Sequence, residues 1–140
     1  KKLSEAARRA IEANANTILR NLGLDLRIRI DDEFNIRVLS SLGEIPVDSI
    51  SGGELTAVAI SIRLALADSL LGRIPGFMIL DEPTAHLDSD RRRGLFEVIK
   101  RVSKTVPQII VVTHDQEVQD VADKVMFVIK EGTTSKVLES

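Results

Sequence analysis

The chain has 140 residues, a formal net charge of −2 and no cysteine, which excludes disulfides and thiolate metal sites and fits a reducing, intracellular environment. Its length predicts one domain with its own core. Its 3% of aromatic residues argue against a base-stacking platform, and at a net charge of −2 any DNA contact requires a local basic patch. No apolar run approaches the roughly 20 residues that span a bilayer, and no signal peptide is visible. We therefore expect a soluble protein, cytoplasmic or nucleoid-associated in a prokaryote and nuclear in a eukaryote. Lys at position 1, where Met is usual, suggests a piece of a longer protein.

Residues 1–22 are predicted to form one helix, because they lack Gly and Pro and carry a narrow apolar seam. The seam residues are spaced three to four apart: Leu3, Ala7, Ile11, Ala15, Ile18 and Leu22. Such a seam is typical either of the end of a coiled coil or of a surface helix that lies on a domain, and the sequence leaves both open. Gly23 is expected to end the helix.

Apolar and charged residues alternate over 24–30 and again over 34–38, with an acidic turn at 31–33. This pattern predicts a β-hairpin with one exposed face. The polar face carries Arg27, Arg29 and Arg37. We interpret these arginines as a solvated strand face, with contact to DNA phosphates as the alternative.

A buried helix is predicted from 51 to about 71, because its apolar residues lie on nearly all sides. Ser51 and Glu54 have the spacing of a capping box, which explains the start of the helix structurally. Gly52 and Gly53 lower helix propensity but bare backbone N–H groups at the positive end of the helix dipole. This favours phosphate recognition over capping alone.

Residues 77–80 are consecutive apolar residues, the pattern of a parallel-sheet strand buried on both faces. Pro83 stops this strand, so Asp81 and Glu82 lie at its carboxyl end, where open α/β sheets place their ligands. Hydrolysis of a γ-phosphate needs a held metal ion and an oriented water, and two adjacent acids can divide these roles. The alternative is that Asp-Glu-Pro is only a surface turn.

A helix capped near Asp88 and extending to about residue 104 precedes a second buried strand, 109–112. His114 follows that strand directly, so two parallel neighbours would bring it to the same sheet edge as Asp81 and Glu82. This favours contact with a γ-phosphate over a hydrogen-bonded loop residue.

Two basic features need a separate explanation. Arg63 is the one cation of the apolar helix, so we expect a specific acid or phosphate partner. The run 91–93 consists of three arginines in the first turns of its helix, where cations oppose the helix dipole. A solvated face is the favoured interpretation of this run, with a DNA or partner contact as the alternative.

The last segment is predicted to contain a short helix near 118–122 and a closing hairpin, 125–129 and 135–138. The element order is that of an α/β protein with a mostly parallel sheet and flanking helices. No Gly-x-x-x-x-Gly-Lys-Ser/Thr motif occurs, so nothing cradles the β- and γ-phosphates. We expect a second segment to supply this phosphate loop, and the chain alone not to hold ATP well.

Four motifs together resemble those of ABC-type ATPases in order and spacing. They are Ser51-Gly52-Gly53-Glu54 (signature), Ile79-Leu80-Asp81-Glu82-Pro83-Thr84 (Walker B), Leu87-Asp88 (D-loop) and Thr113-His114-Asp115 (H-loop). Glu54, where transporters usually have Gln, points to the SMC-like branch of DNA-maintenance ATPases. Asp-Glu-Pro-Thr and the final Gly-x-x-Ser-Lys-Val look most like the double-strand-break repair ATPases of the Rad-fifty type.

This resemblance implies the C-terminal lobe of an ABC-type (P-loop NTPase) head, with residues 1–22 as the base of a coiled coil and 23–140 as the C-terminal half of the head. Asp81 would hold magnesium through water, Glu82 would polarise the attacking water, and His114 would contact the γ-phosphate of ATP. The signature residues Ser51, Gly52, Gly53 and Glu54 would bind nucleotide held by a second head, with Asp88 crossing the interface. Arg63 matches a basic residue of the signature helix that links nucleotide state to the coiled coil.

The resemblance implies an ATPase that acts only when completed by its N-terminal lobe and a second copy of the head. Its implied partners are double-stranded DNA and a nuclease of the Mre-eleven type. The alternatives are the head of another SMC-like chromosome-maintenance ATPase, a transporter ATPase subunit, or a lobe that dimerises without catalysis.

Overall fold

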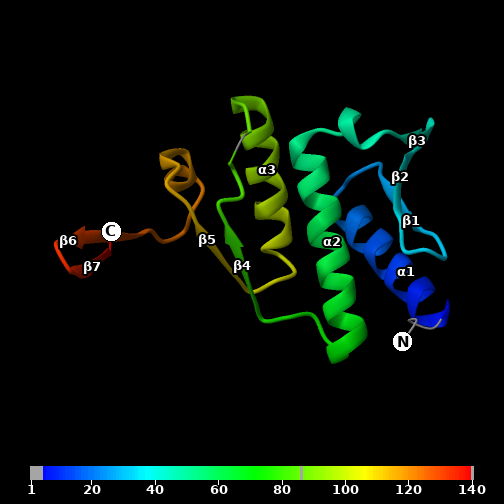
Figure 1. The fold of residues 1–140 in the computed structure, drawn as a ribbon, viewed down its shortest axis with the longest axis horizontal. Helices are drawn as coiled ribbons and strands as arrows, with labels where there is room; N and C mark the ends of the chain where they lie inside the picture. Colours follow the sequence, from blue (N-terminus) through cyan, green and yellow to red (C-terminus); the bar gives the residue numbers. More distant parts are fainter. Residues whose placement is uncertain (1–4, 86, 140) are drawn as a thin grey trace.

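The computed structural model describes residues 5–85 and 87–139. Figure 1 shows the elements in the predicted order of helix, hairpin, helix, strand, helix, strand and hairpin. The elements are α1 (Glu5–Asn21), β1 (Arg27–Ile30), β2 (Ile36–Ser40), β3 (Gly43–Ile45), η1 (Val47–Ser49), α2 (Gly52–Leu71), β4 (Phe77–Asp81), α3 (Ser89–Val102), β5 (Gln108–Val112), η2 (Gln116–Asp120), β6 (Met126–Glu131) and β7 (Thr134–Glu139). No helix in the described ranges has the length and apolarity that crossing a membrane requires.

The described strands do not form the mostly parallel sheet that the sequence predicts. They form three separate sheets, β1-β2-β3, β4-β5 and β6-β7. Within the described residues only β4 and β5 pair in parallel. The reason is connectivity: the short turns within the first and last sheets allow only antiparallel pairing, whereas α3 supplies the crossover that a parallel pair needs.

The core lies around α2, which packs against α1 on one side and α3 on the other (Figure 1). The predicted seam of α1 points into this core, since Ile11, Ala15 and Leu22 are buried. Leu3 lies outside the described residues. The described part of α1 is therefore a surface helix whose apolar seam lies on the domain. Its continuation into a coiled coil stays a prediction.

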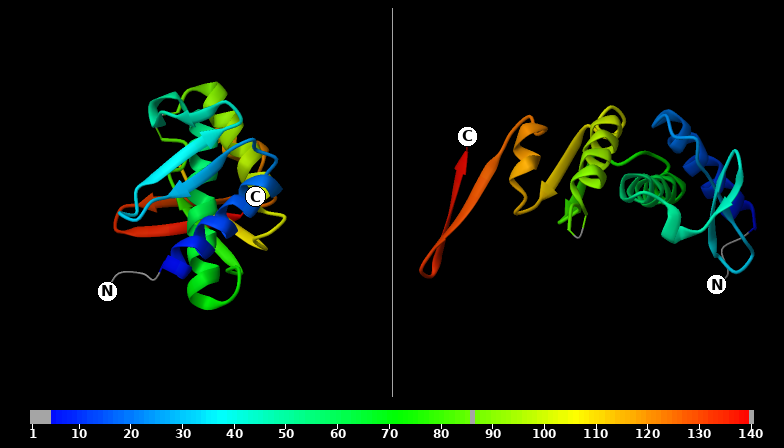
Figure 2. Two further views of the ribbon diagram at one scale, coloured as in Figure 1. Left: turned by 90° about the vertical axis from the view of Figure 1, so that its right-hand side faces the viewer. Right: turned by 90° about the horizontal axis from the view of Figure 1, so that it is seen from above.

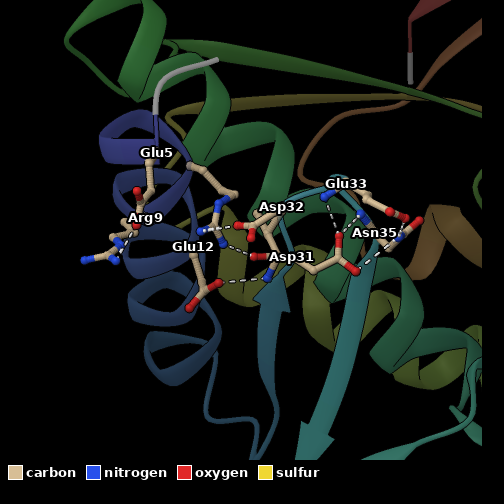
Figure 3. Close-up of polar contacts among 9 residues, drawn as sticks. Glu5, Arg9, Glu12, Asp31, Asp32, Glu33 and Asn35 are labelled. Carbon is tan, nitrogen blue, oxygen red and sulfur yellow. Dashed lines mark hydrogen bonds and ion pairs between the residues drawn. The ribbon is translucent and has the colours of Figure 1, made fainter. Parts of the chain in front are cut away.

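Polar side chains on α1 fasten this helix to the free edge of β1. The side-chain amide of Asn16 accepts a hydrogen bond from the backbone N–H of Ile28 (2.8 Å) and donates one to the carbonyl of the same residue (3.0 Å). One turn earlier, Glu12 accepts from the N–H of Ile30 (2.7 Å), and Arg8 donates to the Ile30 carbonyl. Figure 3 shows Glu12 pointing from α1 towards the end of β1. These side chains take the place of a neighbouring strand and protect an edge that would otherwise be open.

The acidic turn of the first hairpin is organised by Asp31, as Figure 3 shows. Its carboxylate accepts hydrogen bonds from the backbone N–H groups of Glu33 and Asn35 (both 2.9 Å) and from the Asn35 side chain (3.1 Å). The Asn35 side chain is the main reason that the pKa of Asp31 is lowered. The predicted hairpin is confirmed, and its arginines are exposed, with Arg37 paired to Glu44 of β3 at 3.5 Å.

The prediction that the parallel strands are buried on both faces is wrong for this chain. Leu80 is buried, and Met78, Ile109 and Val111 pack against the core. The opposite face is open, with Phe77, Ile79, Ile110 and Val112 exposed. Figures 1 and 2 show α1, α2 and α3 all on the same side of the β4-β5 sheet, and the exposure of these four residues shows that its second face is largely open among the described residues.

Two helix predictions also need correction. Helix α2 has the predicted bounds and is covered by α1 and α3, but it is not buried all round, because several leucines are exposed: Leu55, Leu66, Leu70 and Leu71. The short helix expected near 118–122 is the 3₁₀-helix η2, Gln116–Asp120. The closing hairpin β6-β7 is confirmed, and Figure 2 shows it at the far end of the molecule from α1.

Candidate active site

The carboxyl ends of β4 and β5 lie side by side, as the sequence predicts. Asp81 ends β4 directly opposite Val112, which ends β5. The chain leaves β4 through a further backbone hydrogen bond, from the N–H of Glu82 to the Val112 carbonyl (2.7 Å). The residues after the two strands are therefore brought to one sheet edge.

At this edge Glu82 and His114 contact each other directly. The Glu82 Oε1 and His114 Nδ1 atoms are 2.8 Å apart, and the Thr113 hydroxyl donates to Glu82 Oε2 at 3.2 Å. Glu82 has a φ of 45°, a left-handed conformation that non-glycine residues adopt at a cost of roughly 1–3 kcal/mol. Strain of this kind is concentrated at functional sites, which fits the role expected for Glu82.

The contact shifts the pKa values of both groups in opposite directions. The hydrogen bond from His114 is the main cause that lowers the pKa of Glu82, against a smaller opposing effect of burial. The same hydrogen bond, followed by the charge of Glu82, raises the pKa of His114. Glu82 is therefore ionised at neutral pH, which is the state that a proton acceptor requires.

Asp81 lies beside this pair but takes no part in it. Its side chain is exposed and has no hydrogen-bond or ion-pair partner among the residues that the structure describes. The same residues contain no cluster of three or more His, Asp or Glu side chains fit to hold a metal ion. One free carboxylate still fits magnesium, because this ion is usually bound by one or two carboxylates together with water and substrate phosphates.

The start of α2 has the predicted capping box. The N–H of Glu54 donates to the Ser51 hydroxyl, and the N–H of Ser51 donates to the Glu54 carboxylate, both at 3.2 Å. Gly53 has a packing explanation that the sequence did not reveal: a Cβ atom placed there would lie 2.8 Å from the backbone carbon of Gly94 in α3. The glycine lets the two helices approach, so the choice of residue at 53 does not by itself require a phosphate.

The turn before α3 covers the start of α2. A Cβ atom on Gly52 would lie 2.9 Å from the Leu87 side chain. The next residue, Asp88, caps α3 by accepting a hydrogen bond from the N–H of Arg91 (2.8 Å). The structure thus forms two groups from the predicted site residues, Glu82 with His114, and the Ser51-Gly52 helix start with the Leu87-Asp88 turn.

The two basic features of the sequence have different outcomes. Arg63 is exposed and has no acidic partner among the described residues, contrary to expectation, because its position on α2 is not enclosed by other elements. In the arginine run, Arg93 is exposed and pairs with Asp90 within its own helix (2.6 Å), which fits a solvated face. Arg92 is half-buried and makes contacts outside α3, which sequence spacing did not indicate.

The fold is that of a part of the head domain of SMC proteins. The SMC head domain from Thermotoga maritima matches with a TM-score of 0.68 at 23% identity, over 96% of this chain and 49% of that chain. The SmcHead crystallised with the C-winged helix domain of ScpA matches with a TM-score of 0.63 at 26% identity, over 95% and 43%. A family model described as the RecF/RecN/SMC N terminal domain matches residues 9–136, and the chain belongs to this family.

Curated relatives share more of the sequence. The DNA double-strand break repair Rad50 ATPase of Methanocaldococcus jannaschii is 44% identical over 110 residues, which are 79% of this chain and 11% of that protein. The protein of the same name from Sulfurisphaera tokodaii is 39% identical over 139 residues, 96% of this chain and 16% of that protein. The chain thus spans only a small part of the length of these relatives.

Proposed function

We propose that this chain is the C-terminal lobe of a Rad50-like ATPase head, which hydrolyses ATP when a second segment supplies the phosphate loop. The observation that carries this proposal is the contact of Glu82 with His114 at the carboxyl edge of β4-β5, with the free carboxylate of Asp81 beside it. Among the described residues one face of the β4-β5 sheet is largely open, with Phe77, Ile79, Ile110 and Val112 exposed, and this is the surface on which we place the other lobe. We call the combination of the two lobes the assembled head.

In the assembled head, Glu82 accepts a proton from the water that attacks the γ-phosphate. His114 orients the Glu82 carboxylate through its Nδ1 atom and lies at the same edge, where its other ring nitrogen would donate to the γ-phosphate. Asp81 would hold a magnesium ion through water, and such an ion would supply positive charge to the phosphates. Thr113 positions the second oxygen of Glu82 through its hydroxyl.

A second head would close on this site through the start of α2. Gly52 and Gly53 have backbone N–H groups at a helix N-terminus, a favourable place for a phosphate, and the Ser51 hydroxyl lies beside them, with Glu54 holding the cap through the Ser51 N–H. Asp88 lies in the adjoining turn, from which it reaches across the interface. ATP would therefore join two heads and hydrolysis would release them.

The names of the two relatives specify repair of DNA double-strand breaks, which supports our proposal of double-stranded DNA as a partner. A nuclease of the Mre-eleven type as a second partner, and α1 as the base of a coiled coil, are proposed from the motif resemblance alone. The alternative is the head of another SMC-like protein, which the similarity to solved SMC heads supports. The higher identity to the Rad50 ATPases favours the first assignment.

The test compares the chain alone with the chain mixed with a lobe that carries the phosphate loop. ATP binding is measured by calorimetry and head dimerisation by light scattering. We expect magnesium-ATP to bind only in the mixture, and we expect its binding to double the molar mass of the assembled head, because two heads join. Tight binding by the chain alone would contradict the proposal, because the site would then be complete without a phosphate loop.

A further inference from the structure

We propose that Arg92 is a positioning residue that connects the Leu87-Asp88 turn to the segment that carries His114. This inference rests on the proposed function, since it assigns to Arg92 a part in the same hydrolysis. Arg92 would hold His114 against Glu82 and make that contact depend on the turn at the head interface.

The guanidinium of Arg92 contacts two loops at once. Its Nε atom donates to the Leu87 carbonyl at 3.0 Å. Its Nη1 atom lies 3.7 Å from the Asp115 carboxylate and 3.5 Å from the Glu117 carboxylate. The planar guanidinium has several N–H donors and can contact the Leu87 carbonyl and the two carboxylates at the same time, which a lysine ammonium does less well.

Its two neighbours in the arginine run behave differently. Arg91 and Arg93 pair with acids three residues earlier, Asp88 and Asp90, within the first turns of α3. The side chain of Arg92 is 32% exposed, against 74% for Arg93. A cation in the first turn of a helix opposes the helix dipole, so Arg92 is not explained by the stability of α3. Its contacts are with other elements.

Asp115 passes the connection on to the catalytic pair. Its side chain is 12% exposed and caps η2 by accepting a hydrogen bond from the N–H of Glu117 (3.0 Å). Its own N–H donates to the Thr113 hydroxyl (3.0 Å), which in turn donates to Glu82. His114 therefore lies between Thr113 and Asp115, and these hydrogen bonds fix the positions of both residues.

The other end of the network reaches the surface that would meet a second head. The Leu87 carbonyl that Arg92 holds belongs to the turn that covers Gly52, and Asp88 follows it. A displacement of this turn would move Arg92, and through Asp115 the segment of His114. Arg92 thus links closure of the heads to the geometry of hydrolysis.

The test replaces Arg92 in the assembled head. Arg92→Met keeps most of the apolar stem and removes the guanidinium, and Arg93→Met is the matched control from the same helix. We expect Arg92→Met to lower kcat about 10- to 100-fold, the size of effect that small misplacement of a catalytic group produces, with KM for ATP changed less than about twofold. Arg92→Lys is expected to recover part of kcat, because it keeps the charge opposite Asp115 and Glu117.

A second readout needs no nucleotide. The imidazole signal of His114 in nuclear magnetic resonance, at one fixed pH, is expected to move in Arg92→Met towards its position in Glu82→Gln, and to stay in place in Arg93→Met. A purely structural role for Arg92 predicts instead a lower thermal midpoint with an unchanged kcat at a temperature where the protein is folded.

The outcomes separate this inference from the proposed function. If Glu82→Gln abolishes turnover but Arg92→Met has the kcat and the His114 signal of Arg93→Met, the positioning role is wrong and the proposed function stands. If the assembled head without any substitution does not hydrolyse ATP, the proposed function is wrong, and the positioning role of Arg92 is wrong with it.

Discussion

The crossing of α2 and α3 predicts opposite effects for the same added methyl group on its two sides. In Gly53→Ala the new Cβ atom would lie 2.8 Å from the Gly94 carbon and 3.1 Å from the Leu95 nitrogen, both backbone atoms that cannot move without shifting α3. Overpacking of this kind costs roughly 1–3 kcal/mol, and better helix propensity returns at most about 1 kcal/mol. We expect Gly53→Ala to lower the free energy of unfolding by about 1–2 kcal/mol.

In Gly94→Ala the nearest atom to the new Cβ is 3.8 Å away, which is ordinary van der Waals contact. Replacing a glycine within a helix then gains about 0.5–1 kcal/mol. The assay is urea unfolding of the chain without nucleotide, followed by circular dichroism, with the midpoints of both variants compared at equal slope. If Gly53→Ala were as stable as the parent, the packing explanation for this glycine would be refuted. The remaining explanation would be that glycine leaves the backbone N–H groups accessible to a phosphate.

The remaining predictions concern individual side chains. The pKa of His114, measured by nuclear magnetic resonance without magnesium, should lie above its ordinary 6.5 and fall towards that value in Glu82→Gln; a value at or below 6.5 in the parent would contradict the contact. The contribution of this pair to stability should be complete between about pH 4.5 and 6.5, and should be lost as pH rises through the folded pKa of His114 or falls through that of Glu82. Asn16→Ala should cost about 1–3 kcal/mol in urea unfolding, because both backbone groups of Ile28 lose their partner; a loss below 0.5 kcal/mol, roughly, would mean that water replaces the amide. Ser61→Ala should leave thermal stability unchanged or raise it by about 1 kcal/mol, because the buried hydroxyl has no hydrogen-bond partner among the described residues; a clear loss of stability would reveal a partner such as bound water.

Local patterns were sufficient to predict most elements and one half of the site. Alternation over 24–38 predicted the hairpin β1-β2, and the two apolar runs predicted β4 and β5. Because both runs end in polar residues, parallel pairing predicted that Glu82 and His114 share one edge; the structure confirms the shared edge and shows a direct contact that was not predicted. The strand β3 was missed because its three residues are too few to show a period.

Features that depend on distant segments could not be predicted in this way. The apolar run of β4 shows that both faces can be buried, but it does not show that the described residues cover only one. The reason for Gly53 lies in Gly94, and the partners of Arg92 lie in the loop after β5, so neither follows from the local sequence. Asn16 was missed because the predicted seam of α1 was apolar, whereas a polar row beside it binds the strand edge.

The most direct test of the central claim is the rate of ATP hydrolysis by the assembled head with and without Glu82→Gln. This change keeps the shape of the side chain and removes the group that accepts the proton, and Glu44→Gln, at an exposed position on β3, is the matched control. A positioned base contributes roughly 10²- to 10⁴-fold, so the account predicts a loss of at least about 100-fold for Glu82→Gln and none for the control. Equal rates in Glu82→Gln and the parent would contradict the assignment of this edge as the catalytic site.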